Sequence, residues 1–159
     1  MSDAIRAAVF ADTHSNTSGM IEAVRRCRPD VIVHLGDYER DTECLRQTFP
    51  DIPLYCVRGN CDIAAVSPDT DVVPLGPVKA FITHGHIYDV NWGTDRLVYA
   101  AQEQGCKIAM YGHTHEVEYE ETGGVKIINP GTAGKGRFPT WALVEVLENG
   151  GITCEIRNI

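Results

Sequence analysis

Ala7-Ala8-Val9-Phe10-Ala11 is an apolar run that ends abruptly at Asp12-Thr13-His14, and the fold of the whole chain is best inferred outward from it. A short, continuous apolar run is typical of a strand buried on both faces, and the polar residues after it then lie at the carboxyl end of that strand. The pattern recurs at Val31-Ile32-Val33-His34-Leu35, which is followed by Gly36-Asp37. The sequence therefore predicts two buried strands that each deliver polar side chains to one edge of a sheet.

An amphipathic helix is expected between these two strands. Its apolar positions recur at helical spacing and are Met20, Ile21, Val24 and Cys27. Thr17 or Ser18 is a suitable N-terminal cap, and Pro29 is a natural stop. Strand, helix and strand together predict a βαβ unit with parallel strands.

Further elements follow the same kind of reading. A helix is expected at 41–49 and a third buried strand at 54–57, and then the rhythm changes to a hairpin of 72–75 with 78–83. After them we expect a helix at 94–105, a strand at 107–111, a half-buried strand at 116–120, a strand at 125–128 and a last hairpin of 140–147 with 152–156. The fold class is thus α/β, with two packed mixed sheets, helices outside them, and a single domain over 1–159.

Composition restricts the function. The net charge of −8 disfavours a broad surface for nucleic acid or anionic membrane, so neither extended nucleic acid nor a membrane is an expected partner. No apolar run approaches the roughly 20 residues of a membrane span. The six cysteines form no C-x-x-C pair and are expected to be reduced thiols, most of them buried, so a cytoplasmic location is expected.

Side chains that bind metals follow the expected strands in five separate segments. They are Asp12, His14, Asp37, Asn60, His84, His113 and His115. The carboxyl ends of several strands converge on one rim of a sheet, so these side chains are expected to lie together. Carboxylate with imidazole suits Mn, Fe, Zn, Ni or Co. Seven ligands exceed the needs of one four-coordinate ion, so a two-metal centre is expected, with Asp37 as the best bridging carboxylate.

Tyr111-Gly112-His113-Thr114-His115 contains the last two of these ligands. Set beside the other strand ends, the two imidazoles are interpreted as a divergent pair, one for each of two metals, with a turn supplying the divergence. Gly112 is expected to supply that turn, because glycine adopts backbone angles that a side chain would forbid.

The ordered motifs resemble those of the calcineurin-like metallophosphoesterases. They are Asp12-Thr13-His14, Gly36-Asp37, Gly59-Asn60-Cys61-Asp62, Thr83-His84-Gly85-His86 and Gly112-His113-Thr114-His115. Chain length and the Gly-Asn-Cys-Asp variant are similar to the small bacterial and archaeal phosphodiesterase branch, which is related to the retromer scaffold subunit. The resemblance covers residues 8 to about 132 and implies a four-layer α/β/β/α sandwich. It implies one metal on Asp12, His14, Asp37 and His115, and a second on Asp37, Asn60, His84 and His113.

The resemblance also implies hydrolysis of a phosphoric ester, preferentially a diester, with two divalent ions, Mn first among them. Two such ions lower the pKa of a shared water and hold hydroxide in line with the phosphorus. Asn60, Cys61, Asp62 and His113 are the expected catalytic residues. Asn60 both ligates and donates its amide to a phosphate oxygen, and Asp62 fixes the loop or an imidazole.

Cys61 departs from the better-known members of the superfamily, in which a histidine follows the asparagine and protonates the leaving oxygen. We therefore expect His86, water or no group at all to supply that proton. His86 and Arg58 are candidates for contact with substrate, as are Lys135 and Arg137, although a surface ion pair is the more usual role for each of Arg58, Lys135 and Arg137 taken alone. His34, inside an apolar strand, is expected to be a hydrogen-bonded buried histidine rather than a ligand.

Two other functions remain open at this stage. One is a non-catalytic scaffold that uses the same fold to bind proteins, as the retromer subunit does. The other is a nuclease, which is less favoured because the chain lacks a basic tract to follow a long backbone. The favoured partner is a small phosphoester, and the substrate, the native metal and the oligomeric state, a homo-oligomer included, stay open.

Overall fold

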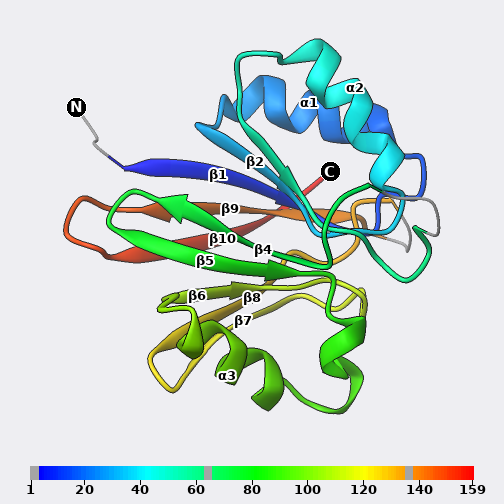
Figure 1. Cartoon of the computed structure of the whole chain (residues 1–159). Coiled ribbons are helices and arrows are strands. Elements are labelled where there is room, and N and C mark those ends of the chain that lie inside the picture. The colour runs from blue at the N-terminus through cyan, green and yellow to red at the C-terminus, as the bar shows by residue number, and fades with distance from the viewer. Residues whose placement is uncertain (1–3, 63–65, 135–137) are drawn as a thin grey trace.

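Two mixed β-sheets of five strands each pack face to face, with helices on the two outer faces (Figure 1). The structure is a computed structural model that describes residues 4–62, 66–134 and 138–159. Lys135 and Arg137 lie outside the described residues. The α/β/β/α arrangement confirms the expected fold class.

The first sheet has the strand order β10-β9-β1-β2-β3. Its strands are β1 (Ile5–Phe10), β2 (Val31–His34), β3 (Leu54–Cys56), β9 (Thr140–Val146) and β10 (Ile152–Asn158). β1, β2 and β3 pair in parallel, as the βαβ pattern predicts, whereas β9 and β10 pair antiparallel. The helices on its outer face are α1 (Thr17–Cys27), the short 3₁₀ turn η1 (Glu39–Asp41) and α2 (Thr42–Thr48).

The second sheet has the order β4-β5-β6-β8-β7. Its strands are β4 (Thr70–Leu75), β5 (Val78–Thr83), β6 (Ile108–Met110), β7 (Glu118–Thr122) and β8 (Val125–Asn129). Two 3₁₀ turns, η2 (His86–Tyr88) and η3 (Val90–Trp92), precede its outer helix α3 (Asp95–Glu103). The expected hairpin of β4 and β5 is present and antiparallel.

Three buried apolar clusters hold the layers together. The largest lies between the two sheets and includes Val9, Val33, Ile82 and Met110. A second joins the first sheet to α1 and α2, with Phe10 stacked on Trp141 at a ring separation of 5.5 Å. The third packs α3 on the second sheet. Strands buried on both faces explain why their sequences are continuously apolar rather than alternating.

One strand differs from its prediction. The half-buried strand expected at 116–120 is β7, which runs from Glu118 to Thr122, two residues later, lies at the edge of its sheet and is exposed along nearly its whole length. The alternating sequence does form a strand, which pairs with β8. Because this strand lies at the edge of the sheet, neither of its faces is covered well enough to be half-buried. None of the helices in the described residues has the length and apolarity needed to cross a membrane.

Candidate metal centre

The structure brings the seven candidate ligands together from the loops after β1, β2, β3, β5 and β6. Two groups have ligand atoms within 4.8 Å of one another. One group is Asp12, His14 and His115, and the other is Asp12, Asp37 and His84. Backbone hydrogen bonds between loops hold this rim, since Asp12 N donates to Gly36 O and Gly112 N donates to His84 O. The parallel strands deliver their polar ends to one place, as expected.

His84 is buried, and its hydrogen bonding fixes its tautomer. Its Nδ1 lies 2.8 Å from Leu35 O, so Nδ1 carries the proton and donates it to that carbonyl. Burial lowers the pKa of His84 to about 4, so the ring is neutral at pH 7. Nε2 then presents a lone pair to oxygen atoms of three residues, at 3.1 Å from Asn60 Oδ1, 3.5 Å from Asp37 Oδ2 and 3.8 Å from Asp12 Oδ1. Such an arrangement of electron pairs suits a cation bound between them.

Asp12 gives the same indication. Its side chain is buried, and its Oδ2 accepts a hydrogen bond of 3.2 Å from His113 N. Among the described residues, no group donates a hydrogen bond to its Oδ1, which lies 3.3 Å from His115 Nε2. Burial, followed by the charge of Asp37, raises the pKa of Asp12 to about 8. A buried carboxylate with an unsatisfied oxygen is costly unless a positive charge offsets it, so these residues fit a divalent cation.

His113 and Asn60 complete the group around His84. His113 Nδ1 lies 3.3 Å from His84 Nε2 and 3.2 Å from Asn60 Oδ1. Asp12 belongs to both ligand groups, and Asp37 to the one with His84. The assignment of Asp37 as the carboxylate that bridges two ions therefore stays a prediction. Asp12, which belongs to both ligand groups, is also placed near both ion positions.

The ligand loops have unusual backbone conformations. Five of the seven ligands have positive φ angles: Asp12 (53°), His14 (45°), Asp37 (59°), His113 (69°) and His115 (63°). Residues other than glycine rarely adopt positive φ angles. Each such residue costs on the order of 1–3 kcal/mol and persists only where the surrounding structure imposes it. Strain of this kind gathered on one set of side chains is typical of a functional site.

The expectation that Gly112 supplies the turn is wrong. The left-handed conformations fall on His113 and His115 themselves. At Gly112, a Cβ atom would lie 2.9 Å from Ala11 Cβ and 3.1 Å from Asp12 Oδ2. Glycine is needed here because the histidine loop passes close against the loop after β1, not because the chain reverses at this residue.

Asp62 holds the loop that carries Asn60. Its Oδ2 accepts hydrogen bonds from Asp37 N at 2.9 Å and Gly59 N at 2.8 Å, and Cys61 N donates to Asp37 Oδ1 at 3.0 Å. The loops after β2 and β3 are thus joined at Asp37. A Cβ on Gly59 would lie 2.1 Å from Asp37 Oδ1, so this contact also requires a glycine.

The other candidates lie around the rim. Cys61 is exposed, and its Sγ lies 3.9 Å from Asn60 Nδ2. His86 stands beside the ligands, with its ring centroid 5.5 Å from that of His84, and its buried Nδ1 has no hydrogen-bond partner among the described residues. Arg58 Nε donates to Asp69 Oδ1 at 2.8 Å, so its guanidinium is engaged in an ion pair.

Sequence reasoning missed Asp41. His34 is fully buried and hydrogen bonded, as expected, with Nε2 3.1 Å from Thr13 Oγ1. Thr13 Oγ1 in turn donates to Asp41 Oδ2. Nothing in the local pattern identified Asp41, because an aspartate at the start of a helix is ordinarily a capping residue.

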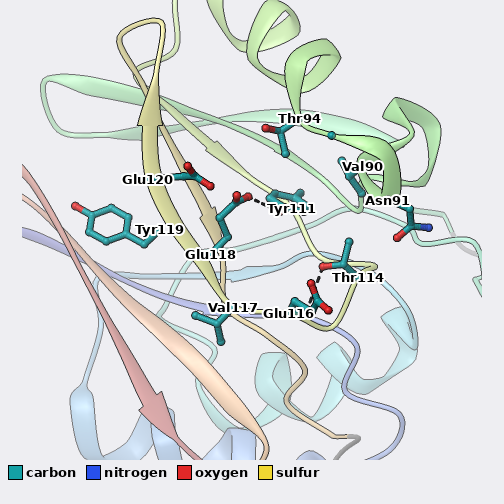
Figure 2. A pocket seen from close by; sticks show the side chains of 11 residues that line it. Val90, Asn91, Thr94, Tyr111, Thr114, Glu116, Val117, Glu118, Tyr119 and Glu120 are labelled. Carbon is teal, nitrogen blue, oxygen red and sulfur yellow. Dashed lines mark hydrogen bonds between the residues drawn. The ribbon is translucent and has the colours of Figure 1, made fainter.

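A cavity of about 610 Å³ adjoins the histidine loop. Thr114, which lies between the two ligand histidines, forms part of its wall. Figure 2 shows Glu118 and Glu120 of β7 on the side of the strand that faces Tyr111 and the segment of Val90, Asn91 and Thr94. Tyr111 donates its hydroxyl to Glu118, and Glu116 N donates to Thr114 Oγ1. Burial raises the pKa of both Glu118 and Tyr111. Three glutamates line the cavity, so it disfavours a polyanion.

Curated proteins of similar sequence are phosphoesterases by name. A probable metallophosphoesterase of Bacillus subtilis is 29% identical over 127 residues, which is 78% of this chain and 72% of that protein. A phosphodiesterase of Methanocaldococcus jannaschii is 41% identical over a shorter stretch of 59 residues, 37% of this chain and 32% of that one.

Solved structures share the whole fold. A conserved uncharacterized protein of Streptococcus pneumoniae, described as a predicted phosphoesterase, has a TM-score of 0.77 at 24% identity and covers 100% of both chains. Vps29 of Entamoeba histolytica, solved with Zn²⁺, has a TM-score of 0.74 at 21% identity, covering 97% of this chain and 99% of its own. The model of the calcineurin-like phosphoesterase superfamily domain matches residues 5–149. With its two-sheet fold and ligand-bearing rim, the chain belongs to the calcineurin-like phosphoesterase superfamily.

Proposed function

We propose that the protein is a phosphodiesterase that depends on two divalent metal ions and hydrolyses a small phosphoester. The observation that carries the proposal is the environment of His84, whose Nε2 lone pair faces oxygen atoms of Asn60, Asp37 and Asp12 at 3.1–3.8 Å. The membership of the superfamily and the phosphodiesterase of M. jannaschii support the same chemistry.

The residues divide between two ion positions. Asp12, His14, Asp37 and His115 would hold one ion, and Asp37, Asn60, His84 and His113 the other. Bound divalent ions acidify water and neutralise the charge that develops on phosphate oxygens. Mn²⁺ is the ion we expect, with Ni²⁺, Co²⁺, Fe²⁺ and Zn²⁺ as alternatives, because carboxylate and imidazole ligands suit all of them.

The chain's own groups would bind and orient the ester. Asn60 is exposed at the rim, and its amide can donate to a phosphate oxygen while its carbonyl oxygen ligates. Asp62 keeps Asn60 and Asp37 in place through the loop that it holds. Cys61 is a poor proton donor beside cations, so esters with acidic leaving groups are the expected substrates.

We propose a cytoplasmic location for the protein. Its net charge is best suited to a small substrate. The net charge of −8 and the glutamates of the adjoining cavity oppose a long nucleic acid backbone. A small ester has only one phosphate to bring to the metal ions, so the same charge matters less to it.

A bis(p-nitrophenyl) phosphate assay tests this function. With Mn²⁺ the protein should release nitrophenol from the diester faster than from p-nitrophenyl phosphate, and chelator should stop it. Asp37→Asn and His84→Ala should each lower the rate by at least about a hundredfold, since the first removes the negative charge of a ligand and the second removes the ligand itself. Asp30→Asn, at the other end of β2, is the matched control and should keep the rate. A rate indifferent to both substitutions and to chelator would reveal a contaminant.

A non-catalytic protein-binding role is the second candidate, favoured by the likeness of the whole fold to Vps29. All seven candidate ligands are present in the described residues and lie together, which a scaffold does not require. The diester assay separates the two, because a scaffold would give no metal-dependent hydrolysis at any of the five metals.

A further inference from the structure

Asp41 holds the loop that carries Asp12 and His14 at two points. Its Oδ2 accepts a hydrogen bond of 2.7 Å from Thr13 Oγ1 and another of 2.7 Å from the backbone N of Ser15. Thr13 and Ser15 are the two neighbours of His14 in the chain. Asp41 is the last residue of η1, directly before α2. One of its carboxylate oxygens therefore holds both neighbours of His14, which we assign as a metal ligand.

The hydrogen bonds continue in one direction to His34. Gly36 N donates to His34 Nδ1 at 3.2 Å, so the ring proton resides on Nε2, which donates to Thr13 Oγ1 at 3.1 Å. The Thr13 hydroxyl proton is then directed to Asp41. All three side chains are buried. In a buried site each such bond is worth more than at the surface, and the loss of any member leaves another polar group unsatisfied.

The loop needs such support. Asp12, His14 and Ser15 have φ angles of 53°, 45° and 72°, so three residues of four are in the left-handed region. Without a restraint the backbone would relax, and the imidazole of His14 would move relative to the carboxylate of Asp12. The network also ends at Gly36, beside Asp37, so it connects the loops that carry three of the candidate ligands.

We propose that Asp41 is a positioning residue for the metal centre, which acts through Thr13 and the Ser15 amide to hold Asp12 and His14 in the geometry that binds the first ion. His34 fixes the direction of the Thr13 hydroxyl and links it to the loop of Asp37. The proposal rests on the proposed metal-dependent function, and it assigns a role to three buried polar residues that would not themselves touch metal or substrate.

Mn²⁺ titration of metal-free protein by calorimetry tests the proposal without reference to activity. Thr13→Val keeps the shape of the side chain and removes the hydroxyl. It should weaken the tighter Mn²⁺ site by about 10–100-fold, the range found for partners that orient metal ligands. Thr13→Ser restores the hydroxyl and should bind within about threefold of the unmodified protein. The Mn²⁺ affinity of Asp41→Asn should lie between those of Thr13→Val and Thr13→Ser, because the amide oxygen can accept a hydrogen bond but carries no charge.

A matched control separates positioning from general stability. Asp30 also accepts a backbone hydrogen bond, from Arg6 N at 2.8 Å, but lies at the opposite end of β2. Asp30→Asn removes the same charge and should leave Mn²⁺ affinity unchanged. In addition, Thr13→Val and Asp41→Asn combined should bind little more weakly than the worse single variant, because both interrupt one network.

The outcomes are distinct. Unchanged Mn²⁺ affinity in a folded Thr13→Val protein, checked by circular dichroism, would overturn the positioning role and leave the metal centre standing. If Thr13→Val does not fold, the Mn²⁺ affinity of folded Asp41→Asn protein is measured instead, and an unchanged affinity would likewise overturn the positioning role. An unmodified protein that binds no Mn²⁺, Zn²⁺ or Co²⁺ would overturn both the positioning role and the proposed function.

Discussion

The buried carboxyl of Asp12 makes the stability of the metal-free protein depend on pH in an unusual direction. Its pKa is raised from 3.8 to about 8 in the folded protein, chiefly by burial. Between these values the folded state keeps a proton that the unfolded chain has released. Raising the pH therefore favours unfolding through this group. Its stabilising contribution is fully present below pH 3.8 and is lost as the pH rises through about 8.

The histidines oppose this effect, chiefly at lower pH. Burial lowers the pKa of His34 and His84 from 6.5 to about 4, so both stabilise the folded state as the pH rises from 4 to 6.5. At pH 6.5 half of the unfolded histidines are still protonated, so their contribution levels off only near pH 7.5, and it offsets part of the Asp12 effect below that pH. From pH 6.5 to 8, linkage predicts that the free energy of unfolding falls by about 1 kcal/mol once the histidines are included. For a domain of this size that is a fall in melting temperature of about 2–4 °C.

Urea denaturation of chelator-treated protein at pH 6.5, 7.25 and 8 measures this directly. Asp12→Asn cannot ionise and should remove the fall, whereas Asp30→Asn should keep it. Saturating Mn²⁺ should reverse the trend, because a bound cation favours the ionised carboxylate. A stability that is flat or rising over this interval, and equal in the Asp12→Asn variant, would refute the reasoning about Asp12.

Three further substitutions test the loop after β3. Gly59→Ala would place a Cβ 2.1 Å from Asp37 Oδ1 and should weaken Mn²⁺ binding, measured by calorimetry, by about tenfold or more. Unchanged affinity would show that the loop can move to accommodate the methyl group without disturbing Asp37. Asp62→Ala leaves the N–H groups of Asp37 and Gly59 without their acceptor and should cost about 2–4 kcal/mol of unfolding free energy in urea, so a loss below the error would contradict its role. Cys61→His should raise the rate on diesters with poor leaving groups, by up to the 10²–10⁴-fold typical of a general acid, and Cys61→Ser should change little; loss of all turnover in Cys61→Ser would give the thiol a direct role.

The ligand-bearing segments could be predicted from the sequence because a local pattern, an apolar run followed by a polar residue, marks each of them. A buried strand must be apolar throughout, so the first polar residue after it, such as Asp12 or His84, marks the end of the strand. Convergence of those ends then follows from parallel pairing. The seven residues come together in the structure for that reason, although the division between two ions is still a prediction.

What could not be predicted depends on contacts between distant segments. The sequence predicts the hairpin of β9 and β10, but its return to the first sheet pairs β9 with β1, from the other end of the chain, and periodicity carries no signal for that pairing. The role of Gly112 is set by Ala11, a hundred residues earlier, and is invisible in its own loop. Asp41 is likewise defined by its bonds to Thr13 and Ser15 and not by its place in a helix.

Anomalous scattering from crystals of the protein grown with Mn²⁺, recorded on both sides of the manganese absorption edge, tests the metal centre most directly. We predict two manganese peaks at the rim. One should be bound by Asp12, His14 and His115, the other by Asn60, His84 and His113, and Asp37 should contact both. A rim without manganese, or a single ion bound away from His84, would contradict the two-metal centre.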